Sequence, residues 1–266
     1  MMVSQTSFGI LKLLLLIPGV AYLGLVVFAA TFANRLVFPA PAASYKDSPD
    51  IIKFPYDDKG RSVSMIFLQN PGSDQLIFYH HGNGEDLQHT LGKMQFLREA
   101  GYSVLAWDYP GYGTSDGRPT EKLVLEIAEK IWNRIPADYG YAHDQVVHYG
   151  YSLGGGPAIW LAKKYACAGV IVEGTFTSIF RVGLPIKLLP WDLFDNQRWI
   201  PDITCPILIM HGTEDETVPF SHAKKLYELA PDPKSFTWVH NGRHTDLLDS
   251  HQETYLDSLK RFTESL

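Results

Sequence analysis

Cysteine is scarce in this chain, which has only Cys167 and Cys205 among its 266 residues. Two cysteines allow at most one bridge, so they exclude both a disulfide framework and a cysteine-rich zinc site. Each lies inside an apolar segment, and a free cysteine behaves as a small apolar side chain. We therefore interpret both as core residues.

Runs of basic residues are also missing. The chain has 23 Lys and Arg against 29 Asp and Glu, and no basic cluster that would displace counterions from phosphates, so we expect no nucleic-acid partner. The 22 glycines and 17 prolines are scattered, which excludes a fibrous or low-complexity chain. With 45% apolar and 20% charged residues, the composition is globular and excludes intrinsic disorder.

Charge is absent from residues 13–32, between Lys12 and Arg35. A helix rises about 1.5 Å per residue, so this run matches the roughly 30 Å hydrocarbon core of a bilayer. The two flanking basic side chains can extend to the membrane interface. We expect residues 1–35 to form an uncleaved N-terminal membrane anchor and residues 36–266 to form the globular domain.

This segment has two alternative interpretations. A cleaved signal peptide would use the small residues near Ala33, but its apolar region is usually only about 7–15 residues long. A buried core helix would need a polar face toward water, and the run has none. The side of the membrane that the globular domain faces stays open, because Lys12 and Arg35 give little charge bias.

The rest of the chain alternates between strand-like and helix-like segments. Short apolar runs rich in β-branched and aromatic residues predict strands at 51–54, 63–68, 76–79, 104–107, 146–149, 169–172, 207–210 and 236–239. Amphipathic stretches predict helices at 85–100, 120–135, 152–165, 220–229 and 252–262.

This alternation predicts an α/β fold with a mostly parallel, eight-stranded sheet between helices. From residue 76 onward the strands are almost entirely apolar, as expected for strands buried on both faces. We expect the first two to form an antiparallel edge. Residues 175–204 interrupt the rhythm with several prolines and aromatic residues, and we interpret them as a small cap-like insertion over the carboxyl edge of the sheet.

A Gly-x-Ser-x-Gly motif lies between a predicted strand and a predicted helix, with Ser152 at its centre. In that context it predicts a nucleophile elbow, a strained turn that raises the serine hydroxyl at the sheet edge. Ser115 is not a second nucleophile, because no helix follows it directly.

A serine nucleophile needs a base and an orienting acid, which follow the elbow in the order acid, then histidine. Asp215 is the best acid, because it lies in the loop after the strand at 207–210. Its neighbours Glu214 and Glu216 are expected to be solvated. Glu173, after the preceding strand, stays open as the alternative acid.

His244 is the predicted base, since it follows the last strand and Gly242 allows a sharp loop there. We assign His240 to the strand end and His251 to the start of the last helix. His240 and His244 have the spacing of a helical zinc site, but Gly242 and the lack of an adjoining Glu argue against one. We therefore expect neither a metal nor a cofactor.

The oxyanion of the reaction needs hydrogen-bond donors. The backbone N–H groups of Asn83, after the strand at 76–79, and of Leu153, at the start of a helix, are the predicted donors. We interpret His81 as a structural residue of the same loop, and residues 108–115 as a rigid loop that shapes the cleft.

Five motifs occur in order along the chain: His-Gly-Asn-Gly, Asp-Tyr-Pro-Gly-Tyr-Gly-x-Ser, Gly-Tyr-Ser-Leu-Gly-Gly, His-Gly-x-x-Asp-x-x-Val-Pro and Gly-x-x-His. Together they resemble the α/β-hydrolase superfamily, in particular the small membrane-anchored serine hydrolases that include eukaryotic protein depalmitoylases and fungal bud-emergence hydrolases. The resemblance implies Ser152, Asp215 and His244 as the catalytic triad, and Asn83 and Leu153 as oxyanion donors. The chain has Gly84 where such proteins often have Ala, and it lacks their N-terminal cysteine cluster.

The predicted function is that of a membrane-anchored serine hydrolase that cleaves carboxylic esters or thioesters through an acyl-enzyme on Ser152. The acyl donor is a lipid or a small ester. The same triad would also serve a peptidase or amidase, or an acyltransferase with an acceptor other than water. A non-catalytic membrane scaffold on the same fold is the remaining alternative.

Overall fold

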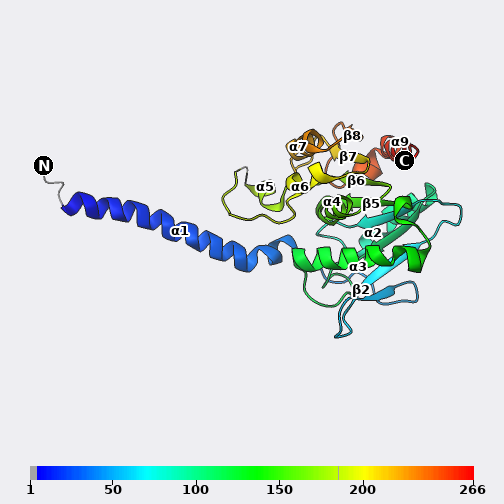
Figure 1. Ribbon diagram of the computed structural model, residues 1–266, viewed down its shortest axis with the longest axis horizontal. Helices are drawn as coiled ribbons and strands as arrows, with labels where there is room; N and C mark the ends of the chain where they lie inside the picture. The colour runs from blue at the N-terminus through cyan, green and yellow to red at the C-terminus, as the bar shows by residue number, and fades with distance from the viewer. Residues whose placement is uncertain (1–4, 185) are drawn as a thin grey trace. The chain divides into compact units, whose positions relative to one another are not determined.

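The computed structural model describes residues 5–184 and 186–266. The chain forms two compact units, and the boundary between them in the sequence lies between Phe38 and Pro39. The first unit is the long helix α1 (Gln5–Val37), drawn in blue in Figure 1. Its segment Leu16–Val37, with a mean hydropathy of 2.0, is long and apolar enough to cross a membrane. Only 11% of that segment is buried, which distinguishes it from the core helix of a soluble protein.

The second unit is built on an eight-stranded sheet with the order β1-β2-β4-β3-β5-β6-β7-β8. Only β2 runs antiparallel to its neighbours β1 and β4, and every other pairing is parallel. The predicted eight-stranded sheet with an antiparallel edge is confirmed. The strands are β1 (Ile52–Pro55), β2 (Ser62–Leu68), β3 (Leu76–His80), β4 (Ser103–Trp107), β5 (Val146–Tyr151), β6 (Gly169–Glu173), β7 (Ile207–Gly212) and β8 (Lys234–Val239).

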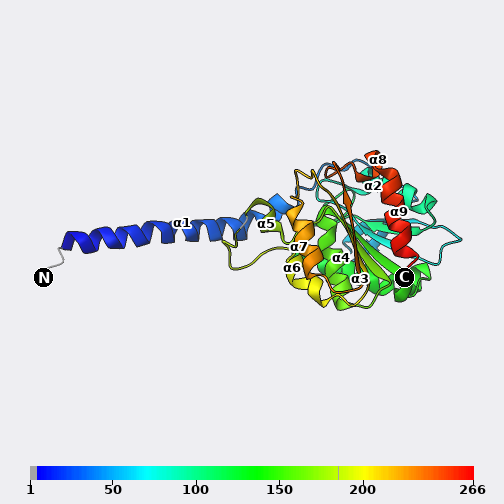
Figure 2. The ribbon, with the colours of Figure 1, turned by 90° about the horizontal axis from the view of Figure 1, so that it is seen from above.

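Helices cover both faces of this sheet (Figure 2). The longer ones are α2 (Leu87–Glu99), α3 (Glu121–Tyr139), α4 (Gly155–Lys164), α7 (Ser221–Leu229) and α9 (Gln252–Thr263). The short ones are α5 (Ile179–Gly183), α6 (Asn196–Trp199) and α8 (Leu247–Ser250). Because side chains alternate along a strand, Ile171 packs in one core with α2 and α9, while its neighbours Val170 and Val172 pack in a second core with α4 and α7.

Helix α3 continues past its predicted end at residue 135. Pro136 lies inside the helix and cannot donate to the carbonyl of Trp132. Nε2 of His143 lies 3.1 Å from that carbonyl oxygen and replaces the missing donor. The helix ends instead at Gly140, whose φ of 78° is the left-handed conformation that commonly terminates helices.

The interruption at residues 175–204 contains α5, α6 and a 3-10 turn (Ile200–Asp202) between β6 and β7. Phe194 is fully buried in it and packs so closely on α4 that a Cβ at Gly156 would overlap its ring. Cys205 is buried as expected, whereas Cys167 is only partly buried. Their Sγ atoms are 3.3 Å apart, and both cysteines are free.

Candidate active site

Ser152 follows the last residue of β5, at the carboxyl edge of the sheet. Its φ of 50° lies in the left-handed region, which strains a residue with a side chain. A Cβ at Gly154 would overlap the carbonyl oxygen of His80, and a Cβ at Gly150 would overlap the backbone of Gly154. Both glycines of the motif are therefore required, because backbone approaches backbone at each of them.

We expect Gly154→Ala to lower the free energy of unfolding by about 3 kcal/mol, because neither the elbow nor the end of β3 can move away from the added methyl group. Gly84→Ala is the matched control. Nothing lies within 4 Å of a Cβ at Gly84, so its effect should stay within about 0.5 kcal/mol. Urea unfolding of both variants measures the difference, and equal stabilities would contradict the close approach at the elbow.

The structure brings Ser152, His244 and Asp215 together, although they come from three different loops. Nε2 of His244 lies 3.0 Å from Oγ of Ser152, and Nδ1 of the same ring lies 2.7 Å from Oδ2 of Asp215. The Asp215 side chain is almost fully buried, and that of His244 is 11% exposed. With its proton on Nδ1, the imidazole presents Nε2 as an acceptor for the serine proton.

Asp215 is held as a carboxylate by four neighbours. Its Oδ1 accepts hydrogen bonds from the backbone N–H groups of Thr217 and Val218, at 2.9 and 2.7 Å. Nε2 of His211 lies 3.2 Å from Oδ2. Burial alone would raise the pKa of Asp215, but the hydrogen bonds from His211 and His244 outweigh it and hold that pKa well below its usual value. The Asp215 side chain is therefore ionised in the folded protein at neutral pH.

Glu173, the alternative acid, has other partners. Its carboxylate oxygens accept hydrogen bonds from Nζ of Lys93, at 2.9 and 2.8 Å, and from the hydroxyl of Tyr149, at 2.5 Å. The side chain of Glu173 is 1% exposed and that of Lys93 is 16% exposed, so this ion pair is largely shielded from solvent. Glu214 and Glu216 are both exposed to solvent. Of the four carboxylates Glu173, Glu214, Asp215 and Glu216, Asp215 is the one that lies within hydrogen-bond distance of His244.

The two predicted oxyanion donors lie on segments that approach each other closely. Leu153 belongs to the 3-10 turn (Ser152–Gly154) that leads into α4, and Asn83 lies in the loop after β3. This loop is fixed from two sides, because the hydroxyl of Tyr112 donates to the carbonyl of Asn83 at 2.9 Å and the carboxylate of Glu85 accepts from the N–H of Gly82 at 2.9 Å. A fixed loop is what an oxyanion site requires.

Two side chains singled out as non-catalytic have structural partners. His81 is 1% exposed, and its Nδ1 lies 2.6 Å from the carbonyl oxygen of Gly82. The hydroxyl of Ser115 accepts from the N–H of Ser64 and donates to the carbonyl of Asp108. Within residues 5–184 and 186–266, no group of three or more His, Cys, Asp or Glu side chains is arranged to hold a metal ion.

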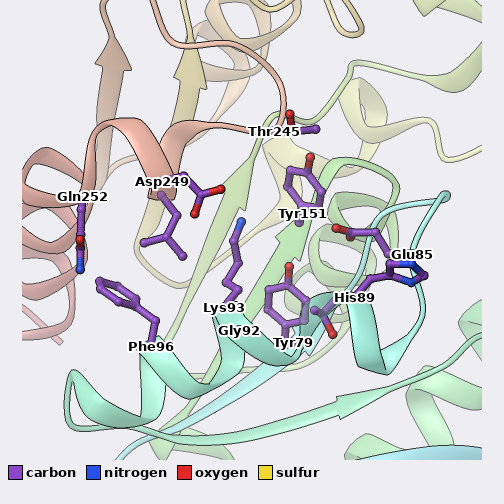
Figure 3. Close-up of a pocket in the computed structure, with 12 residues that line it drawn as sticks. Tyr79, Glu85, His89, Gly92, Lys93, Phe96, Tyr151, Thr245, Asp249 and Gln252 are labelled. Atoms are coloured by element: carbon purple, nitrogen blue, oxygen red, sulfur yellow. The ribbon is translucent and has the colours of Figure 1, made fainter. Parts of the chain in front are cut away.

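Three residues near the site were not predicted from the sequence: His211, Tyr151 and Lys93. The hydroxyl of Tyr151 donates to the carbonyl of His244 at 3.1 Å, so the residue before the serine holds the histidine loop. Nζ of Lys93 lies 4.4 Å from the centre of the Tyr151 ring. Both residues line a cavity of about 490 Å³, in which Figure 3 shows Lys93 extending from α2 toward the space beside Tyr151.

Comparison with known proteins identifies the family. The family described as serine aminopeptidase, S33, matches residues 71–191. The α/β-hydrolase domain-containing protein 17B of Homo sapiens is 36% identical over 208 residues, which are 77% of this chain and 72% of the human protein. The 17C protein of Xenopus tropicalis is 34% identical over 209 residues, 77% of this chain and 67% of its own. The chain belongs to the α/β-hydrolase domain-containing protein 17 family.

Solved structures show the same fold. An esterase of Pyrococcus furiosus superposes with a TM-score of 0.69 at 17% identity and covers 85% of this chain and 96% of its own. The esterase Est1E of Butyrivibrio proteoclasticus superposes with a TM-score of 0.66 at 20% identity, over 80% of this chain and 98% of its own. This α/β-hydrolase is thus a serine hydrolase of the esterase-like type.

Proposed function

We propose that this hydrolase cleaves carboxylic ester or thioester bonds through an acyl-enzyme on Ser152, while its N-terminal helix anchors it in a membrane. The observation that supports this most directly is the hydrogen-bonded line from Asp215 through His244 to Ser152. The strained backbone of the serine adds to it, because strain at a residue with a side chain persists where function requires it.

In the proposed mechanism, Oγ of Ser152 attacks the acyl carbon and His244 takes the hydroxyl proton on Nε2. The tetrahedral oxyanion is stabilised by the N–H groups of Asn83 and Leu153. His244 then gives its proton to the leaving alcohol or thiol, which departs and leaves the acyl-enzyme. A water molecule, deprotonated by the same imidazole, releases the acid and restores the free serine. Asp215 stays ionised throughout and stabilises the imidazolium that forms in each half of the reaction.

A substrate panel separates this proposal from the other reactions that the triad would support. It contains p-nitrophenyl esters of increasing acyl length, the matching thioesters and the matching anilides. We expect hydrolysis of esters and thioesters, with anilides cleaved far more slowly. Faster cleavage of the anilides would favour a peptidase or amidase. If added alcohols or amines, rather than water, received most of the acyl group, the enzyme would be an acyltransferase.

The anchor is the second part of the proposal, with residues 1–35 as anchor and 36–266 as hydrolase domain. The segment Leu16–Val37 has 22 residues, so as a helix it extends about 33 Å, enough for a hydrocarbon core of about 30 Å. In water this helix would expose large apolar side chains, among them those of Leu16, Ile17 and Leu23, each about 60% exposed. A bilayer would remove that apolar surface from water.

We expect the full chain to stay in the membrane pellet after extraction with alkaline carbonate, because a spanning helix resists conditions that release peripheral proteins. N-terminal sequencing of the same material distinguishes an anchor from a signal peptide. Release into the supernatant would overturn the anchor. A mature N-terminus near Asn34 would mean that the segment is cleaved.

A further inference from the structure

A second cavity, of about 420 Å³, is lined by residues of α5, α6 and α7 and of the segments that precede α5 and α7. The three helices are neighbours in both Figure 1 and Figure 2. Among the described residues that line this cavity there is no member of the candidate triad. The cavity is therefore separate from the site where the ester chemistry is proposed.

The walls of the cavity are held together by Thr177, which follows β6 and lies just before α5. Its carbonyl accepts a hydrogen bond from the N–H of Gln197 in α6 at 2.9 Å. Its N–H donates to Nδ1 of His222 in α7 at 3.2 Å, and its hydroxyl lies 2.9 Å from the same nitrogen. Because one residue bonds to both α6 and α7, the cavity is formed without a ligand, which lowers the cost of binding one.

His222 leaves a hydrogen-bond donor for a molecule in this cavity. The side chain lines the cavity and is only 8% exposed. Burial lowers the pKa of His222, so its ring is neutral at pH 7 and has one proton. Nδ1 accepts from the N–H of Thr177, so the proton lies on Nε2. Among the residues that the structure describes, Nε2 of His222 has no hydrogen-bond partner.

The cavity is also electropositive. Arg181 of α5 and Lys225 of α7 line it, and none of the described lining residues is acidic. Lys225 pairs with Glu228 at 3.0 Å, but the two side chains are 52% and 65% exposed, so water screens that pair. Helix α7 begins at Ser221, which also lines the cavity, and the start of a helix carries a partial positive charge.

We propose that this cavity binds a small phosphate monoester. A phosphate monoester carries a charge of about −1.5 to −2 at neutral pH, which matches the two cations Arg181 and Lys225. Its oxygens accept hydrogen bonds from both cations and from Nε2 of His222. A volume of about 420 Å³ is in the range of small-molecule sites and leaves space for the organic part of the ester. The proposal depends on neither the anchor nor the ester chemistry.

The first test is calorimetric titration of the full-length protein in detergent micelles with glycerol 3-phosphate, at an ionic strength kept constant with chloride. We expect saturable binding at one site. Arg181→Gln should raise Kd about tenfold or more, because it removes a charge-assisted hydrogen bond. Lys225→Gln should raise Kd by a smaller factor, since that side chain is half exposed.

Lys224→Gln is the matched control. Lys224 is the preceding residue of the same helix and is exposed, but it is not among the lining residues. It loses the same charge as Lys225→Gln and should leave Kd unchanged. Equal losses in the two variants would show a general effect of surface charge and overturn the site, as would the absence of saturable binding to the wild-type protein. Thermal unfolding without ligand checks that each variant is folded.

Two competing ligands test the chemical class. Acetate should displace glycerol 3-phosphate only weakly, because it carries a single charge; displacement at equal concentration would mean a carboxylate site and overturn the phosphate assignment. Phosphatidic acid added to the micelles distinguishes the source of the phosphate. If it displaces glycerol 3-phosphate, the phosphate chemistry holds but the ligand is a lipid headgroup and the small-molecule proposal is wrong. If it does not, the ligand is a soluble ester, as proposed.

Nuclear magnetic resonance of isotope-labelled histidine tests the donor itself. We expect the proton of His222 on Nε2 before ligand is added, and an Nε2 resonance that shifts with the same saturation as the calorimetric titration. A purely structural His222 would show no such shift. A proton on Nδ1, or an Nε2 resonance that ignores bound glycerol 3-phosphate, would overturn the role of His222 in the site.

Discussion

Ser152→Ala is expected to lower kcat on p-nitrophenyl esters by about 10⁴–10⁶-fold, because the reaction loses its nucleophile while the oxyanion donors remain. The variant should fold, since alanine keeps the Cβ that serine already places in the strained turn at φ 50°. Thermal unfolding of the purified variant provides the control. Near-wild-type hydrolysis by a folded Ser152→Ala protein would refute the elbow assignment.

Asp215→Asn is expected to cost about 10⁴-fold in kcat. The carboxylate accepts from Nδ1 of His244 at 2.7 Å, whereas an amide in its place can donate to that nitrogen and hold the wrong tautomer. The wrong tautomer puts the proton on Nε2, which then cannot accept from Ser152. The loss should appear in kcat, with KM on short esters little changed.

Glu173→Gln is the control for this assignment. Glu173 also follows a strand of the sheet, but its carboxylate is paired with Lys93 rather than with His244. Its substitution leaves the partly buried ammonium of Lys93 without its counter-ion, so we expect lower stability with kcat of the folded enzyme reduced far less than in Asp215→Asn. A larger loss of kcat in Glu173→Gln would require the acid to be reassigned.

The strands β3 to β7 were predictable from the sequence because burial on both faces leaves almost no polar residue inside them. The prediction at 146–149 differs from β5 only at its end, where Tyr151 is also buried. Strand β8 begins two residues earlier than predicted, at Lys234. The ammonium of Lys234 donates hydrogen bonds to the backbone carbonyls of Tyr227 and Ala230, which lie outside the sheet. The backbone of this charged residue can therefore pair in the sheet while its side chain finds partners elsewhere. Composition alone does not reveal such a partner.

The candidate triad was predictable because the carboxyl ends of parallel strands share one edge, and each triad residue follows such an end. The sequence favoured Asp215 as the acid, but this rule alone left Glu173 open, because both residues follow the end of a strand. The structure separates them through Lys93, which is 80 positions from Glu173 in the chain. His211 had a local signal, its spacing of four residues from Asp215, but Tyr151 contacts the loop of His244 from 93 residues away.

Labelling with a fluorophosphonate, followed by intact-mass measurement and peptide mapping, tests the central claim most directly. The probe reacts with a serine only when a base activates it, and the captured phosphonyl group marks the nucleophile itself. We predict a single adduct on Ser152 that forms in the wild-type protein and is lost in Ser152→Ala. An adduct on another residue, or none on the folded protein, would contradict the account.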